Sequence, residues 1–166
     1  ITWAEAHLAV PIADSTQQQV EIFVYDYDTA RQQVLQERGY TKMDDGGVVR
    51  RLCFAEHTLQ DAVMAAGYTL RTTHPADLAD CQQIADLLNA AFARNFHNAL
   101  EYQNFTKLAP SFHNDLDLVA VAPDGTFAAY VGIPYDEANR RGIFEPVCTH
   151  PAHRRLGLAQ TLMLEG

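Results

Sequence analysis

The chain has 166 residues, the length of one ordinary domain, and its 48% hydrophobic and 20% charged residues are close to the average of folded globular proteins. This composition excludes a disordered or fibrous chain. A formal net charge of −9 at pH 7 argues against a nucleic-acid partner, because binding phosphates requires clustered Lys and Arg. The same charge would attract a small cationic amine, or would serve solubility alone.

The spacing of the cysteines and the length of the apolar segments further restrict the class of protein. Cys53, Cys81 and Cys148 are widely spaced and have no CxxC pair or histidine at metal-ligand spacing, so we expect reduced thiols and no metal. No stretch approaches the roughly 18 apolar residues of a membrane span, and the N-terminus has no signal-peptide pattern. We therefore expect a cytoplasmic protein without a membrane partner.

The first third of the chain predicts two helices and three strands. The predicted elements are a helix over 1–10, a strand over 20–25, a helix over 28–38, and strands over 40–43 and 48–54 that flank a hairpin turn. The strand over 20–25 (VEIFVY) is β-branched and aromatic along most of its length. Asp28 predicts the N-cap of the following helix, and Gly39 its end.

The rest of the chain predicts a second series of elements after a polar connector over 55–67. They are a strand over 68–73, a helix through 84–92, a helix over 99–108, strands over 118–122 and 127–133, a charged loop over 136–142, a strand over 143–149 and a helix over 155–166. Asp80 and Gln83 predict a capping box for the first helix, whose apolar residues repeat at helical spacing. The turn Pro123-Asp124-Gly125 predicts a hairpin.

The most informative segment is the strand, tight turn and helix start that contain Arg154-x-x-Gly157-x-Ala159. Small residues at a helix start let the backbone approach a ligand, and the free N–H groups of the first turn receive an anion such as a pyrophosphate. Arg154 and Arg155 add positive charge. Taken alone, the same pattern also fits a plain helix start with a packing glycine.

The strand before this motif contains Pro146, which has no N–H and marks an edge, a bulge or a place where neighbouring strands part. This segment closely resembles the acetyl-CoA motif of GNAT N-acetyltransferases, in which a strand is followed by the pattern V-x-T-x-P and then by R-x-x-G-x-A. The resemblance implies acetyl-CoA as cosubstrate. It implies that the pantetheine arm pairs with the backbone of Val147, Cys148 and Thr149, and that the pyrophosphate is held by backbone amides of Arg154, Arg155, Leu156, Gly157, Leu158 and Ala159.

The resemblance covers nearly all of the chain, but in permuted order. Residues 68–166 supply a GNAT lobe from its first strand to the start of its cofactor helix, and residues 1–54 resemble the closing part of such a lobe. This implies an α/β (α+β) GNAT fold, a mixed and mostly antiparallel central sheet flanked by helices. Two explanations stay open, a fragment of a tandem two-lobe protein similar in plan to mycothiol synthase, or true permutation within one lobe. A homodimer or a partner GNAT lobe is compatible with both.

The implied function is acetyl transfer to a primary amine of a small molecule by direct attack on the thioester. Such a reaction needs a base for the ammonium and a donor for the oxyanion. Glu145 resembles the family's general base, and its other interpretation is a solvated or salt-bridged strand carboxylate. The backbone N–H of Cys148 or Val147 is the candidate oxyanion donor. Cys148 itself has no neighbouring activating residue in sequence, which argues against a thiol nucleophile.

The general acid departs from the family pattern. Where the family often has Tyr, four residues before Gly39, this sequence has Leu35, and Asp28 stands where Asn is frequent. Tyr25 and Tyr27 are candidates to replace the missing acid, and burial in the core is the other interpretation of Tyr25. The departure motivates an alternative function, a non-catalytic GNAT-like lobe that binds CoA or supports an active partner lobe.

The remaining histidines and aromatic residues have two interpretations each. Histidines at positions 97, 150 and 153 are surface or turn residues, or contact substrate. The aromatic residues that line an acceptor pocket or belong to the core are Phe96, Tyr102, Phe105, Tyr130 and Tyr135.

Overall fold

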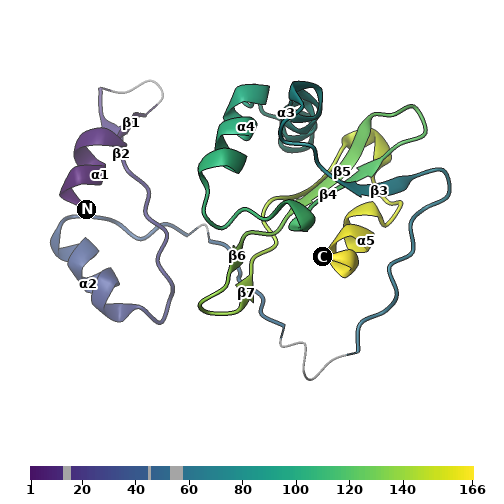
Figure 1. Ribbon diagram of the computed structural model, residues 1–166. Helices are drawn as coiled ribbons and strands as arrows, with labels where there is room; N and C mark the ends of the chain where they lie inside the picture. Colours follow the sequence, from purple (N-terminus) through teal and green to yellow (C-terminus); the bar gives the residue numbers. More distant parts are fainter. Residues whose placement is uncertain (13–15, 45, 53–57) are drawn as a thin grey trace. The chain divides into compact units, whose positions relative to one another are not determined.

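The computed structural model describes residues 1–12, 16–44, 46–52 and 58–166 (Figure 1). Although the length suits one domain, the chain forms two compact units, Ile1–Leu52 and Cys53–Gly166. None of the helices in these described ranges is long and apolar enough to cross a membrane.

The first unit contains two short helices and one pair of two-residue strands. Its elements are α1 (Thr2–His7), β1 (Val10–Pro11), β2 (Gln18–Gln19) and α2 (Thr29–Glu37). As predicted, the Asp28 carboxylate caps α2 by accepting a hydrogen bond from the N–H of Arg31 at 3.1 Å. Gly39 follows the helix with φ +84°, a conformation that glycine adopts without strain. Both predicted helices of this unit are present, but the first, predicted over 1–10, ends at His7, and Val10 belongs to β1.

The strands predicted for this unit are wrong in the described residues. Residues 20–25, 40–43 and 48–52 form no strand, and residues 53–54 lie outside the described part of the chain. An apolar, β-branched run favours a strand only where a neighbouring segment pairs with its backbone. No described segment does so for residues 20–25, and Phe23 is left 86% exposed.

The second unit holds a four-stranded antiparallel sheet flanked by helices, which confirms the predicted fold class. Its strands appear in the order β3-β4-β5-β8 across the sheet. Its elements along the chain are β3 (Thr69–Thr72), α3 (Leu78–Phe92), α4 (Ala99–Leu108), the 3-10 turn η2 (Asn114–Leu116), β4 (Asp117–Val121), β5 (Phe127–Gly132), β6 (Tyr135–Asp136), β7 (Arg141–Gly142), β8 (Val147–Thr149), the 3-10 turn η3 (Pro151–His153) and α5 (Leu158–Glu165).

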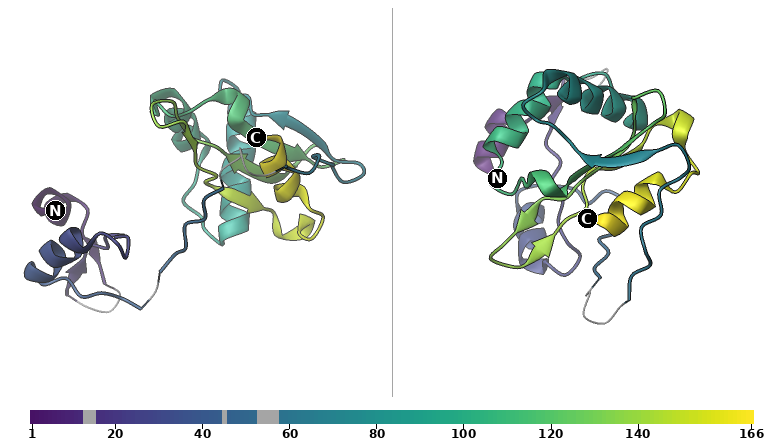
Figure 2. Two further views of the ribbon diagram at one scale, coloured as in Figure 1. Left: turned by 90° about the horizontal axis from the view of Figure 1, so that it is seen from below. Right: turned by 45° about the vertical axis from the view of Figure 1, so that its right-hand side comes forward.

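The sheet is the middle layer of three in this unit. Helix α3 packs on one face and α5 on the other (Figures 1 and 2). Successive strand residues point to opposite faces, so the buried strand β5 contributes to both cores. The core on the α3 side contains Cys81, Ile84, Leu87, Tyr102, Val119, Phe127, Tyr130 and Cys148. The core on the α5 side contains Leu118, Ala120, Ala122, Ala128, Ala129, Val131, Ile133, Leu158 and Leu162.

The N-terminus of α3 corrects one sequence prediction. The capping residue is Asp77, whose carboxylate accepts a hydrogen bond from the N–H of Ala79 at 2.9 Å. Asp80, the predicted cap, lies inside the first helical turn and binds Arg71 of β3 instead. By sequence, either Asp77 or Asp80 could be the N-cap residue. Asp80 instead binds Arg71 of β3, nine residues earlier in the chain, and the cap is therefore Asp77.

Two predictions near the end of the sheet are also corrected. Residues 136–142, predicted as a charged loop, include the small hairpin β6–β7, whose turn is held by Asp136 accepting from the N–H and the side-chain amide of Asn139 at 3.1 and 2.6 Å. The strand predicted over 143–149 is shortened to β8. Pro146 precedes it and offers no N–H to a neighbouring strand.

Candidate functional site

Strand β8 is an edge strand whose outer side is unpaired among the described residues. It pairs with β5 alone, in the register Ala129↔Thr149 to Val131↔Val147. The N–H of His150 donates to Ala128, so the peptide groups of even-numbered residues face β5. By the alternation of an antiparallel ladder, the N–H and C=O of Val147 and Thr149 point to the free edge, and those of Cys148 face β5.

The start of β8 is irregular at Glu145 and Pro146. The carbonyl of Gly132 accepts from the N–H of Glu145 at 3.0 Å, and the N–H of Gly132 donates to the carbonyl of Pro146 at 3.1 Å. Two residues of one strand thus face a single residue of the next, which is the arrangement of a β-bulge. The sequence had predicted an edge, a bulge or parted strands at Pro146, and the structure has an edge and a bulge.

A turn with unusual backbone angles follows β8. His150 caps η3 through its Nδ1, which accepts from the N–H of Ala152 at 3.2 Å. Arg155 and Gly157 then have φ values of +66° and +73°. These two left-handed residues delay the predicted helix, so α5 begins at Leu158.

This turn leaves seven consecutive N–H groups without an internal acceptor. None of the N–H groups from Arg154 to Gln160 donates to a residue that the structure describes, and the first helical bond of α5 runs from Thr161 to Gly157 at 2.9 Å. Successive free N–H groups at a turn and a helix start form an anion-binding concavity. A Cβ added at Gly157 would meet nothing within 4 Å, so the backbone is approachable there.

The turn is anchored by side chains on both sides. The guanidinium of Arg154 donates to the carbonyl of Ala91, near the end of α3, at 3.2 Å. The Tyr68 hydroxyl and His153 Nδ1 are hydrogen-bonded at 2.8 Å, which assigns His153 a structural contact. Below the turn, Leu158 and Leu162 of α5 are buried against the sheet. Apolar burial therefore holds α5 while its first N–H groups stay free.

Glu145 is exposed and lines a small cavity of about 20 Å³ at the end of the sheet. This volume holds about one water molecule. The other lining residues are Phe105, Phe112, His113, Leu116, Asp117, Tyr130, Gly132, Ile133, Pro134 and Pro146. Two carboxylates and several aromatic rings thus surround the cavity, and its described lining includes no Lys or Arg.

Asp117 is a feature that the sequence analysis missed. This carboxylate is 2% exposed and accepts hydrogen bonds from the hydroxyls of Thr73, Tyr102 and Tyr130. Burial raises its pKa above the ordinary value of an aspartic acid. The only sequence signal was an Asp at the head of the apolar strand DLVAV, since its three partners lie on other elements.

Other predicted site residues lie elsewhere or serve the core. Cys148 is buried, and desolvation raises the pKa of its thiol to about 11, which disfavours the nucleophilic thiolate. Tyr102 and Tyr130 are buried core residues that face Asp117. Tyr25 and Tyr27 belong to the first unit, where their rings stack at 5.1 Å.

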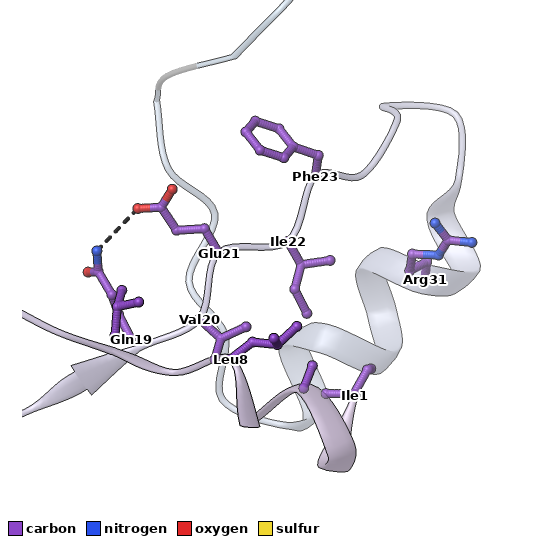
Figure 3. Close-up of a pocket in the computed structure, with 10 residues that line it drawn as sticks. Ile1, Leu8, Gln19, Val20, Glu21, Ile22, Phe23 and Arg31 are labelled. Atoms are coloured by element: carbon purple, nitrogen blue, oxygen red, sulfur yellow. Dashed lines mark hydrogen bonds between the residues drawn. The ribbon is translucent and has the colours of Figure 1, made fainter. Parts of the chain in front are cut away.

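A larger hollow lies within the first unit (Figure 3). It has a volume of about 660 Å³ and is open to solvent. Aliphatic residues and Phe23 make most of its lining, with Gln19, Glu21 and Arg31 as polar members. None of the predicted site residues is among those that line it, so size alone does not make it the candidate site. Nor do the described residues include any group of three or more His, Cys, Asp or Glu placed to hold a metal ion.

Comparisons with known proteins concern the family and the fold of the chain. The model of the acetyltransferase (GNAT) family matches residues 81–165, about half of the chain. No curated protein matches the chain. Among solved structures, a GCN5-related N-acetyltransferase from Sphaerobacter thermophilus is similar at 18% identity with a TM-score of 0.56, over 83% of this chain and 42% of that one.

A second similar structure is the N-myristoyltransferase of Saccharomyces cerevisiae with bound myristoyl-CoA and inhibitors. It has 11% identity and a TM-score of 0.51, over 76% of this chain and 32% of that one. At these identities the likeness concerns the fold. The chain spans less than half the length of either structure.

Proposed function

The chain belongs to the acetyltransferase (GNAT) family, and from that premise we propose that it binds acetyl-CoA and transfers the acetyl group to a primary amine of a small molecule. The observation that carries the proposal is the run of unpaired N–H groups from Arg154 to Gln160 beside the free edge of β8. Bound acetyl-CoA supplies an acetyl group activated as a thioester, which the amine attacks directly as the CoA thiol leaves.

The turn before α5 fits a diphosphate. Its free N–H groups lie in succession at the positive end of a helix, and the open space at Gly157 lets an anion approach the backbone. Two adjacent arginines add charge, although the guanidinium of Arg154 is partly engaged with Ala91. We assign the diphosphate to the backbone N–H groups of Arg154, Arg155, Leu156, Gly157, Leu158 and Ala159.

The free edge of β8 is the proposed seat of the pantetheine arm. Val147 and Thr149 direct their peptide groups outward, so they pair with the amides of the arm as an added strand would. Cys148 contributes the strand between them, with its own peptide groups turned to β5. Of the two candidate oxyanion donors, the N–H of Val147 is therefore favoured over that of Cys148.

Glu145 is the proposed general base. It lies at the bulge that precedes β8, two residues before Val147, and it lines the cavity at the end of the sheet. A carboxylate accepts a proton from an ammonium directly or through one water. The cavity has the size of that water.

The lining of the cavity favours a cationic acceptor. Glu145 contributes an exposed carboxylate, and aromatic rings such as Phe105 and Phe112 line the same cavity. Carboxylates and aromatic faces both stabilise an ammonium group. The net charge of −9 adds long-range attraction for such a substrate.

Leu35 supports an alternative function, that of a non-catalytic lobe. This residue occupies the position of the family's expected acid, is buried and has no ionisable group. A lobe that binds CoA without catalysis, or that supports an active partner lobe, accounts for its presence. We propose a domain assignment in which residues 1–54 are the closing part of a lobe, 55–67 a connector and 68–166 a second lobe. The tandem two-lobe plan, a homodimer and a cytoplasmic location are proposals as well.

Acetyl-CoA binding is tested by thermal unfolding of the full-length protein. A ligand present at 100 times its dissociation constant stabilises the native state by about 2.7 kcal/mol, which raises the melting temperature by several degrees. Leu156→Asp would place a carboxylate in the anion-binding turn and abolish the shift. Leu78→Asp is the matched control, because Leu78 and Leu156 are 51% and 45% exposed and Leu78 starts α3, opposite the end that Arg154 contacts. An equal shift in both variants would contradict the assigned turn.

The two functions are separated by Glu145→Gln. With Glu145 as base, this change lowers acetyl transfer to a panel of small primary amines by about 100-fold or more and leaves the thermal shift with acetyl-CoA intact. Unchanged transfer would remove Glu145 from catalysis. A full thermal shift with no acetyl transfer to any amine in the unchanged protein would support the non-catalytic lobe.

A further inference from the structure

The buried carboxylate of Asp117 joins four elements of the second unit. It lies at the start of β4, Thr73 follows β3, Tyr102 lies on α4 and Tyr130 on β5. The hydroxyls of all three partners donate to it, and the bond from Tyr130 measures 2.7 Å. All four residues are at most 7% exposed. A buried carboxylate with three donors is fully satisfied and fixes the positions of its partners.

Tyr130 differs from the other partners because its hydroxyl also lies against the backbone of Gly132. A Cβ added to Gly132 would be 2.8 Å from the Tyr130 hydroxyl oxygen and 3.4 Å from Cδ of Pro146. The side chain of Tyr130 therefore occupies the space that any larger residue at position 132 would need. Gly132 permits this close approach because it has no side chain.

Gly132 is in turn the residue that holds the bulge before β8. It accepts from the N–H of Glu145 and donates to the carbonyl of Pro146. The same cavity is lined by Asp117, Tyr130, Gly132 and Glu145. A continuous series of contacts therefore runs from the buried carboxylate to the exposed one.

We propose that Asp117 is a positioning residue for Glu145, which it places by holding the Tyr130 hydroxyl against Gly132 and thereby fixing the bulge at Glu145 and Pro146. The inference deepens the proposed function, since the positioning matters for catalysis only if Glu145 acts as the base. Thr73 and Tyr102 complete the hydrogen bonding of Asp117, and the three atoms nearest a Cβ built on Gly132 belong to Tyr130 and Pro146 instead.

Amide hydrogen exchange in the full-length protein tests the positioning directly, because the N–H groups of Glu145 and Gly132 both form bulge bonds. In Tyr130→Phe we expect these two amides to exchange about tenfold faster relative to the amides of β4, because the hydrogen bond that holds the Tyr130 side chain beside them is lost. Tyr102→Phe is the matched control. It also removes one hydroxyl donor from Asp117, and the two bulge amides should keep their rates relative to β4. Equal effects of the two variants would overturn the inference.

A second pair of variants tests the contact between Tyr130 and Gly132. Gly132→Ala would push the new methyl group against the Tyr130 hydroxyl and accelerate exchange at Glu145. The double variant Gly132→Ala/Tyr130→Phe removes the clashing oxygen, so Glu145 should exchange more slowly in it than in Gly132→Ala alone. Additive acceleration in the double variant would show that the two residues do not act through one contact.

These measurements are independent of the chemistry of Glu145. If Glu145→Gln leaves acetyl transfer unchanged, the proposed base is wrong, and the exchange data still decide whether Asp117 fixes the bulge. If Glu145→Gln abolishes transfer while Tyr130→Phe leaves both the bulge amides and transfer unaffected, Glu145 is the base and Asp117 does not position it.

Discussion

The guanidinium of Arg71 forms two parallel hydrogen bonds with the carboxylate of Asp80, from Nη1 to Oδ2 at 2.7 Å and from Nη2 to Oδ1 at 2.8 Å. This pair connects β3 to the first turn of α3. The carboxylate also accepts from the N–H of His74 at 2.9 Å, and the guanidinium lies 4.9 Å from the ring centre of Phe127. A bidentate, partly buried pair of this kind is among the stronger ion pairs in proteins.

Asp80→Asn should lower the free energy of unfolding in a pH-dependent way. The hydrogen bond from Arg71 is the main cause that lowers the pKa of Asp80. A lowered pKa contributes stability above the unfolded value, and this contribution disappears as the pH falls through the folded value. The expected loss is about 1 to 2 kcal/mol at pH 7, reduced by the partial exposure of Arg71, and shrinks below about pH 4.

Urea unfolding of both proteins at several pH values measures this difference. Asp86→Asn is the control, because Asp86 lies on the same helix and, among the residues that the structure describes, accepts only from the exposed side chain of Gln82. It should cost less than about 0.5 kcal/mol at all pH values. A loss for Asp80→Asn that does not change with pH would contradict the ion-pair explanation.

The choice between Asp77 and Asp80 as the N-cap of α3 could not be predicted from local sequence patterns. Helix α3 was predicted from its apolar periodicity, and the hairpin of β4 and β5 from the turn at residues 123–125, because both depend on neighbours in sequence. The choice of cap depends on Arg71, which belongs to another element. For the same reason the strand predicted over 20–25 is wrong, since pairing requires a distant partner.

The same contrast between interactions of sequence neighbours and interactions of distant residues applies to the candidate site. The turn from Arg154 to Ala159 was found in the sequence because its backbone conformation is encoded locally by glycine and the helix start. The network around Asp117 was not found, because Thr73, Tyr102 and Tyr130 come together only in the folded unit. Sequence patterns thus locate the turn that is proposed to bind the anion, and the folded structure adds the polar network that lines the small cavity beside Glu145.

Glycine substitutions should separate backbone strain from binding in the turn. Gly157 and Gly125 have φ values of +73° and +86°, and a Cβ at either position meets nothing within 4 Å. Alanine at each should therefore cost about 1 kcal/mol from the left-handed conformation alone. Gly157→Ala also adds a methyl group where acetyl-CoA is proposed to approach, so it should weaken binding by calorimetry. Gly125→Ala should leave binding unchanged. Equal weakening of acetyl-CoA binding by both variants would argue against the turn at Gly157 as the binding site.

Cys148 should be inert in the native protein. Burial raises the pKa of its thiol to about 11 and also raises that of Cys81, so neither forms a reactive thiolate at neutral pH. Iodoacetamide at pH 8 should alkylate both residues only after unfolding in urea, as followed by mass spectrometry. Direct transfer likewise predicts no acetyl group on Cys148 after incubation with acetyl-CoA. An acetylated Cys148 would instead indicate a covalent intermediate.

The two units should differ in local stability. In the described part of Ile1–Leu52 only Leu35 is buried, whereas β5 is buried along its whole length. Local opening is easier where few apolar contacts are broken, so the amides of α1 and α2 should exchange at least about 100-fold faster than those of β4 and β5. Hydrogen exchange of the full-length protein measures both sets in one experiment. Equally slow exchange in α2 would mean that another surface covers this unit, because its own contacts cannot supply that protection.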